Sequence, residues 1–306
     1  MLRYFLGRLL GAIPLLLAVL TLSFFLVRLA PGSPFQREAE LPEEIRASLA
    51  SGYGFDKPLH QQYFQYLGNA LRGDFGASFI YKDKQVSEII AEALPVSAQI
   101  GALAMLFAVV VGVSLGLLAA VRQNTFLDYF TMTGIMAGKS IPPMVLAPLF
   151  VGFFAITLKW LPVAGWNDGE LLYLIGPVLC LGLYDVAAIA RLSRASLLEI
   201  IRNRYITTAR AKGLPEWRVV LGHATREALC PLVTYLGPAL SSILIGTVVV
   251  EQVFNIPGLG RYLVQAATNR DYTLVLGITT VACAAVLLFN ILSDLALALL
   301  DPRIRL

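Results

Sequence analysis

Residues 93–121 read ALPVSAQIGALAMLFAVVVGVSLGLLAAV, without a charged residue between Glu92 and Arg122. A helix that crosses the hydrocarbon core of a bilayer needs about 20 mainly apolar residues. This run is long enough to cross a membrane as a helix, and it decides the class of protein. We therefore expect a chain that is embedded in a lipid membrane.

Five similar runs lie on either side of it, at 9–27, 129–158, 171–190, 228–250 and 272–293. Charges inside them are limited to Lys139 in the third run of the chain and Asp185 in the fourth. The whole chain is 57% hydrophobic and 14% charged, whereas soluble domains carry about 25% charged residues. The pattern predicts an all-α, polytopic membrane protein with six transmembrane helices.

Loop charges predict the orientation, because loops rich in Lys and Arg stay in the cytoplasm. Segment 191–227 has eight bases and three acids, and segment 31–92 has six bases and nine acids. We expect the first loop and both termini to be cytoplasmic and the second loop to lie outside. The predicted organisation is an N-terminus and first helix (1–30), an extracytoplasmic loop subdomain (31–92) and a five-helix core (93–306) with its cytoplasmic loop.

Shorter signals suggest further detail. Residues 58–72 have apolar side chains near helical spacing before Gly73, and residues 259–269 predict a short re-entrant or interfacial helix. Three prolines, at 142, 143 and 148, break the third span. GxxxG pairs, which allow close helix contact in lipid, occur at 7/11, 112/116 and 134/138.

Residues 134–140 read GIMAGKS and come close to a phosphate-binding loop. That loop needs four residues between its glycines and follows a strand, whereas here three residues separate the glycines inside an apolar span. With three cysteines and two histidines in the chain, we expect no metal site. We also expect no catalytic residues, because no paired carboxylates or nucleophile constellation is present.

The cytoplasmic loop carries the main functional signal, because residues 205–213 read YITTARAKG. A glycine just past a helix end supplies a left-handed cap, and proline suits the first turn of a helix. Gly213 and Pro215 therefore predict a helix, a sharp turn and a second helix. Exposed small and basic side chains there can fit a groove on a partner.

This loop resembles that of the inner-membrane permeases of binding-protein-dependent ABC importers, whose signature is Glu-Ala-Ala, three residues and Gly. Gly213 matches the glycine and Ala209 the second alanine, while Thr207 and Thr208 replace the Glu and the first Ala. The peptide branch has a variant like Tyr-Ile-x-Thr-Ala-Arg-Ala-Lys-Gly-Leu, which residues 205–214 match. The resemblance extends over residues 1–306, and the chain is most similar to the first membrane subunit of the oligopeptide permease. The other stretches that look like this branch are 28–35, 73–76, 81–83, 257–260, 270–272 and 301–305.

The resemblance implies a type I ABC importer permease fold in the inner membrane and ATP-driven import of peptides, with oligopeptides as the expected size class. It implies as partners a second homologous permease subunit, two ABC ATPase subunits that hold ATP and Mg, and an extracytoplasmic peptide-binding protein. It implies no cofactor in this chain and no nucleic acid partner. The coupling helix that transmits ATPase motion is then Tyr205, Ile206, Thr207, Thr208, Ala209, Arg210, Ala211, Lys212 and Gly213. A substitution such as Ala209→Glu is expected to impair transport or assembly and to leave the protein folded.

Charges inside a membrane are costly and mark functional or paired groups. Lys139 and Asp185 are candidates for the translocation pathway, where they pair or share a wet cavity; alternatively, Lys139 extends separately toward the membrane surface. Glu251, Asn290 and Asp294 are further candidates, either as pathway-lining groups or as structural helix contacts. A second functional hypothesis is a secondary transporter driven by an ion gradient, with Asp185 or Asp294 as the coupling carboxylate. That hypothesis leaves the structured basic loop unexplained.

Overall fold

The structure is a computed structural model that describes residues 2–29, 56–81 and 83–300. In these residues every regular element is a helix, and a single antiparallel bridge joins Ala77 to Gln85. Part of the predicted outer loop, residues 31–55, and the C-terminal tail, residues 301–306, lie outside the described part. The all-α prediction is confirmed.

Five helices are long and apolar enough to cross a membrane: α1 (Leu2–Leu29), α4 (Val86–Val121), α7 (Leu171–Ile200), α11 (Cys230–Val253) and α13 (Tyr272–Leu300). The third predicted span is instead a bent pair. It consists of α5 (Phe126–Lys139) followed by α6 (Pro143–Phe150) and the π-helix η2 (Val151–Thr157), with a bend of 95° at the break. Counted as one span, this pair makes the sixth, and the break lies directly before Pro143, as the prolines predicted.

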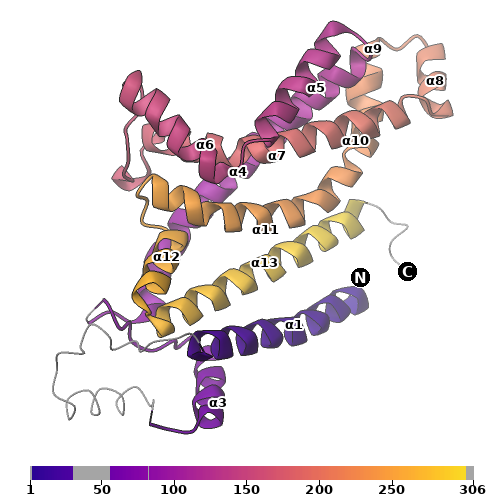
Figure 1. The fold of residues 1–306 in the computed structure, drawn as a ribbon. Coiled ribbons are helices and arrows are strands. Elements are labelled where there is room, and N and C mark those ends of the chain that lie inside the picture. Colours follow the sequence, from indigo (N-terminus) through magenta and orange to yellow (C-terminus); the bar gives the residue numbers. More distant parts are fainter. Residues whose placement is uncertain (1, 30–55, 82, 301–306) are drawn as a thin grey trace.

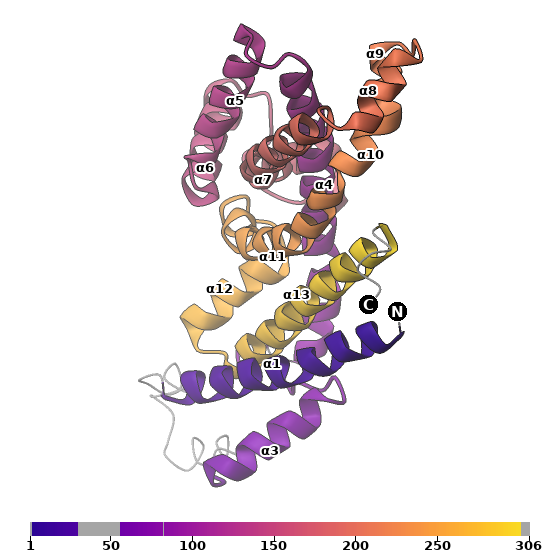
Figure 2. The same ribbon diagram turned by 90° about the vertical axis from the view of Figure 1, so that its right-hand side faces the viewer.

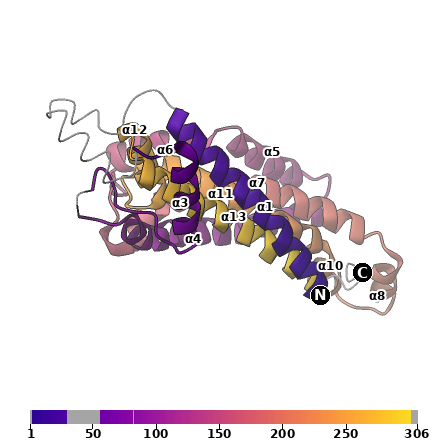
Figure 3. The ribbon, with the colours of Figure 1, turned by 90° about the horizontal axis from the view of Figure 1, so that it is seen from below.

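The long helices are stacked side by side. α1 packs on α13, α13 on α11, and α11 on α7 and α4, while α5 packs on the other side of α7. Figure 1 shows α1, α13 and α11 with their axes roughly aligned, α13 running opposite to the other two. Turned by 90°, Figure 2 shows the order of the stack, with α5 and α6 at one end and α1 at the other. α1 therefore forms one edge of the molecule, as the view along the stack in Figure 3 also shows.

Short helices gather at the two ends of the long ones. α3 (Leu59–Ala70) and α12 (Leu259–Asn269) lie at one end (Figure 1). At the other end lie α8 (Arg204–Ala211), α9 (Glu216–Arg218), the π-helix η4 (Val219–Ala224) and α10 (Thr225–Ala228). The start of α1 and the end of α13 lie at this second end, so both fall on the side of the basic loop. A short 3₁₀ turn, η3 (Asn167–Gly169), precedes α7.

α3 confirms the helix predicted over 58–72 and is tied to the membrane helices. The Tyr63 hydroxyl lies 2.7 Å from Thr21 Oγ1 on α1, and the Tyr66 hydroxyl lies 3.0 Å from Thr280 Oγ1 on α13. The Phe24 ring also stacks on Tyr66. The described part of segment 31–92 is therefore attached to the core, and its last residues, 86–92, form the first turns of α4.

Glycines allow the closest helix contact, between α4 and α7. A Cβ atom added to Gly112 would lie 2.8 Å from Ile189 Cγ2, and one added to Gly116 would lie 2.9 Å from Ser193 Cβ. Gly182 on α7 has the same role toward Phe107 on α4, with 2.6 Å to its Cδ1 atom. The predicted contact at 112/116 is confirmed. Around the glycines of the other two pairs, 7/11 and 134/138, a Cβ atom would meet no described atom within 4 Å.

We predict that Gly116→Leu separates α4 from α7 and lowers the free energy of unfolding by at least about 1–3 kcal/mol, the usual effect of overpacking. The matched control is Gly11→Leu, because Gly11 is exposed and its added side chain meets open space. Thermal unfolding of the two purified variants in detergent measures the difference. Equal melting temperatures would show that the glycine contact does not hold the two helices together.

Candidate coupling loop and membrane-embedded polar sites

One face of α8 packs against the rest of the chain, and its other face is exposed. Ile206 and Ala209 are buried, and they pack in an apolar cluster with Leu197 on α7 and with Val219 and Val220 on η4. Their spacing of three residues places them on the same side of the helix. The other residues of the predicted coupling helix are exposed: Tyr205, Thr207, Thr208, Arg210, Ala211, Lys212 and Gly213.

The turn after α8 confirms the predicted helix–turn–helix. Gly213 has a φ of +77°, and its N–H donates to the Arg210 carbonyl at 2.9 Å. Pro215 directly precedes α9. Arg210 closes the turn, because its Nε atom donates to Glu216 Oε2 at 3.0 Å and its second nitrogen donates to Oε1 at 2.5 Å. This bidentate contact lowers the pKa of Glu216 and raises that of Arg210.

Tyr205 connects α8 to the last turn before α11. Its hydroxyl donates to a carboxylate oxygen of Glu227. Burial and this hydrogen bond raise the pKa of Tyr205 to about 12. The phenol is thus a neutral donor at physiological pH, and the bond to Glu227 persists through that range.

The expectation for Ala209→Glu is wrong in one respect. Only 7% of Ala209 is exposed, so a glutamate there would place an unpaired charge inside the apolar cluster that anchors α8. Burying such a charge is costly, and the variant is expected to be destabilised. The spacing of three residues between Ile206 and Ala209 already indicated that both side chains lie on the same, apolar side of the helix. A fold-neutral test must use an exposed position such as Thr208.

Glu251 is fully buried near the end of α11 and holds the start of α12. Its Oε2 atom accepts hydrogen bonds from the backbone N–H of Gly260 at 2.7 Å and of Arg261 at 3.3 Å. Its Oε1 atom accepts from Ser97 Oγ on α4 at 2.6 Å, and Ser97 Oγ accepts from the N–H of Leu259 at 2.8 Å. The carboxylate thereby satisfies the unpaired donors of a helix N-terminus and complements its dipole. Of the two predicted roles, this geometry supports the helix contact.

Asn290 and Asp294 also make helix contacts. Asp294 Oδ2 lies 3.1 Å from Arg8 Nε, which links α13 to α1. Asn290 Nδ2 donates to the carbonyl of Val286 at 2.9 Å and lies 3.5 Å from Ser241 Oγ on α11.

Lys139 and Asp185 make separate contacts. Asp185 is 2% exposed, and its Oδ1 atom accepts a hydrogen bond from the Tyr235 hydroxyl of α11 at 2.9 Å. Lys139 Nζ lies over the ring of Tyr184, 5.3 Å from its centroid. Over the described part of the chain, none of the ion pairs within 4.0 Å joins Lys139 to Asp185. The direct ion pair, one of the predicted arrangements, is therefore absent from this conformation.

Two buried carboxylates that the sequence reasoning did not single out also hold helix ends. Asp271 accepts from the N–H of Leu274 at 3.1 Å at the start of α13, and from the N–H of Phe79 at 3.1 Å in the outer loop. Asp128 at the start of α5 receives two hydrogen bonds of 2.7 Å from Arg194 on α7. The signal for Asp271 was its place just before a helix. The sequence signal for Asp128 was an acidic residue in the short connection between the second and third predicted spans, at the end of the molecule that carries the basic loop.

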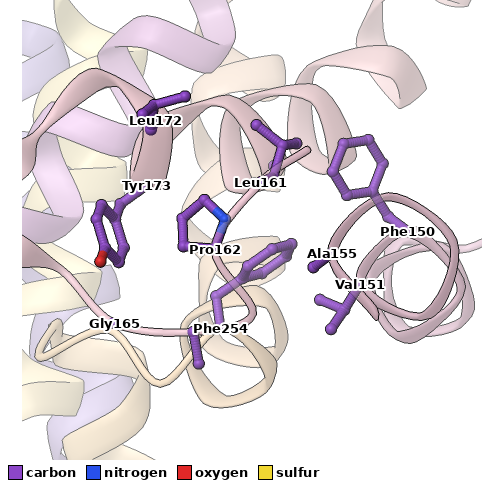
Figure 4. Close-up of a pocket in the computed structure, with 11 residues that line it drawn as sticks. Phe150, Val151, Ala155, Leu161, Pro162, Gly165, Leu172, Tyr173 and Phe254 are labelled. Atoms are coloured by element: carbon purple, nitrogen blue, oxygen red, sulfur yellow. The ribbon is translucent and has the colours of Figure 1, made fainter. Parts of the chain in front are cut away.

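An apolar pocket lies between η2, the start of α7 and the end of α11 (Figure 4). Phe254 extends into it next to Pro162, and the N–H of Gly165 donates to the Phe254 carbonyl at 2.8 Å. The cavity volume is about 10 Å³, which is the size of one water molecule. It cannot hold a peptide, and we interpret it as packing around Phe254.

Similarity to known proteins identifies the family of this chain. Residues 112–306 match the family of the binding-protein-dependent transport system inner membrane component, and residues 1–101 match the model of the N-terminal part of these membrane components. The chain belongs to this family. It is a multi-pass inner-membrane component of a transport system and not an enzyme.

Relatives within the family cover the whole chain. This transport component is 48% identical to the oligopeptide transport system permease protein OppB of Haemophilus influenzae, over 100% of both chains. It is 39% identical to the dipeptide transport system permease protein DppB of Bacillus subtilis, over 100% of this chain and 99% of that one.

The fold of the transport component is also similar to that of a solved structure. The match is to the inward-facing MetNI methionine ABC transporter, with a TM-score of 0.57 and 20% sequence identity. It covers 70% of this chain and 96% of that chain. The predicted type I ABC importer permease fold is confirmed.

We predict that Glu251→Ala releases the start of α12. It leaves the N–H groups of Gly260 and Arg261 without an acceptor, and each unsatisfied buried donor costs about 1–3 kcal/mol. Hydrogen exchange of these two amides should accelerate, and the melting temperature should fall. Asp294→Asn is the control, because it removes a partly exposed ion pair worth about 0–1 kcal/mol. Unchanged exchange in Glu251→Ala would show that the carboxylate does not cap α12.

Proposed function

We propose that this chain is a membrane-spanning permease subunit of an ATP-driven ABC importer that carries peptides, and oligopeptides in particular, into the cytoplasm. The observation that supports this most is the 48% identity to an oligopeptide permease subunit over the full length of both chains. The identity to a dipeptide permease subunit, 39% over nearly the same span, is lower. This difference favours oligopeptides over dipeptides as the substrate class.

The proposal includes an assembly. A second homologous permease subunit completes the pathway, two ABC ATPase subunits bind ATP and Mg, and an extracytoplasmic peptide-binding protein delivers the substrate. The exposed face of α8, which carries small and basic side chains, supports an ATPase contact. Residues 134–140, whose sequence comes close to a phosphate-binding loop, are helical up to Lys139. Their backbone therefore does not form the open loop that would hold a phosphate.

The charge pattern supports the proposed orientation. The basic loop, the start of α1 and the end of α13 lie at one end of the molecule, and α3 and α12 lie at the other (Figure 1). With the basic end in the cytoplasm, α8 faces the ATPases, and α3 and α12 face the binding protein.

The contacts of α8 suggest how ATPase motion reaches the membrane. Its buried face packs on the end of α7 and on η4, and Tyr205 bonds to Glu227 just before α11. A push on the exposed face of α8 is thereby transmitted to α7 and α11. Because packed helices move between discrete arrangements as rigid bodies, this loop can switch the pathway with no chemistry of its own.

The test of this function is purification of the tagged chain from native membranes, followed by reconstitution. Co-purification of a second six-span subunit and P-loop ATPases, with peptide uptake that requires ATP, is the expected result. Uptake by the chain alone in ion-loaded liposomes without ATP would overturn the proposal in favour of a secondary transporter.

We predict that Thr208→Glu reduces peptide-stimulated ATP hydrolysis and uptake at least about tenfold, since a charge at the centre of a docking surface costs on the order of 1.4 kcal/mol or more. Thr208 is exposed on α8, so the melting temperature of the isolated chain should stay unchanged. Gln123→Glu is the matched control, because it places the same charge on an exposed turn at the same end of the molecule. Equal activity of the two variants would argue against α8 as the ATPase contact.

A further inference from the structure

Lys139 is located at the midpoint of the broken span. Fourteen helical residues of α5 precede the break, and fifteen follow it, eight in α6 and seven in η2. Both arms are apolar enough that the pair passes as a membrane span. A lysine at such a depth is costly unless it meets an anion, a protein dipole or water.

Lys139 makes no close ion pair with a described residue, although its charge acts on the Asp185 carboxylate at longer range. Its Nζ atom lies over the Tyr184 ring at 5.3 Å from the centroid, a cation–π contact worth about 0.5–2 kcal/mol. In the described residues no carboxylate lies within 4.0 Å of Nζ. The carboxylate next in sequence to Tyr184, that of Asp185, is buried and accepts a hydrogen bond from Tyr235.

The break around Lys139 lies on the surface of the chain, where the polar residues Lys139 and Ser140 stand beside the exposed apolar side chains of Ile141 and Met144. Lys139 itself is partly exposed, Ser140 is exposed, and a Cβ atom added to Gly134 or Gly138 would meet no described atom within 4 Å. Ser140 Oγ donates to the Met136 carbonyl at 3.1 Å, so the group that lipid tails cannot solvate is the Lys139 ammonium. Where the two arms meet at an angle (Figure 1), the surface is therefore suited to a wet pathway that a polar substrate can enter.

We infer that Lys139 binds the C-terminal carboxylate of the peptide as it passes the break in the third span. The inference rests on the proposed function. Every unmodified linear peptide carries this group whatever its side chains, so a single lysine can recognise substrates of varied sequence. The ammonium group then exchanges the Tyr184 ring for a charge-assisted contact with the carboxylate, which is the stronger of the two interactions.

The experiment uses the complete transporter, with its binding protein, in proteoliposomes. ATP-driven uptake is measured for one pentapeptide with a free C-terminal carboxylate and for its C-terminal amide, each at a concentration that saturates the binding protein. The variants are Lys139→Met and Lys139→Arg. The matched control is Lys159→Met, because Lys159 is an exposed lysine just beyond η2 on the same span.

Lys139→Met is expected to lower uptake of the free acid on the order of tenfold, the lower end of the effect of a hydrogen bond to a charged group, and to leave uptake of the amide unchanged. Lys139→Arg and Lys159→Met should keep the acid-to-amide ratio of the native protein. An equal loss for both peptides, or no loss for either, would overturn the inference.

A further variant separates substrate binding from local charge compensation. If Lys139 only balanced the charge of Asp185, the double variant with Lys139→Met and Asp185→Asn would restore uptake of the free acid, and the inference would fall. We expect the loss to persist in the double variant. Failure of the proposed function itself is distinguishable, because the native transporter would then show no ATP-driven uptake of either peptide.

Discussion

A helix end that is buried away from water must find partners for its unpaired backbone groups, and this constraint shapes how α12 and α13 begin. α12 and α13 start next to buried carboxylates, those of Glu251 and Asp271, which accept hydrogen bonds from their first N–H groups. Each carboxylate also joins a distant part of the chain: Glu251 binds Ser97 on α4, and Asp271 binds the loop at Phe79. The carboxylates that cap these helix starts thereby also hold together the end of the molecule where α3 and α12 lie.

At the opposite end, polar contacts connect the helices that we propose to transmit the motion of the ATPases. Arg194 binds Asp128 and links α7 to the start of α5, and Tyr205 binds Glu227 between α8 and the approach to α11. Between the two ends, α4 and α7 meet closely at glycines, where an added Cβ atom would clash with the facing helix. A closely packed central pair with polar links at the end that carries the basic loop suits a subunit that moves in response to partner proteins, as proposed above.

The broken third span contrasts with this rigid pair. α5 and α6 contact α7 and α11, but the faces of both around the bend are largely exposed. Lys139, Ser140 and two glycines with open surroundings lie there. A partner subunit or a water-filled pathway can solvate the Lys139 ammonium, whereas lipid tails cannot. This exposed break is the region that we assign to the substrate.

The sequence by itself determined five of the six predicted spans and the break in the other one. It also determined the helices near residues 58–72 and 259–269 and the helix–turn–helix of the basic loop. These follow from local causes: apolar runs of membrane length, prolines, and a glycine that takes positive φ. Residue pattern also placed the chain in its family. Tertiary structure alone decided that Glu251 caps α12 and that the Asp185 carboxylate accepts its hydrogen bond from Tyr235. Each of these depends on which helices meet and at what rotation, and that choice is made by contacts between residues far apart in the chain.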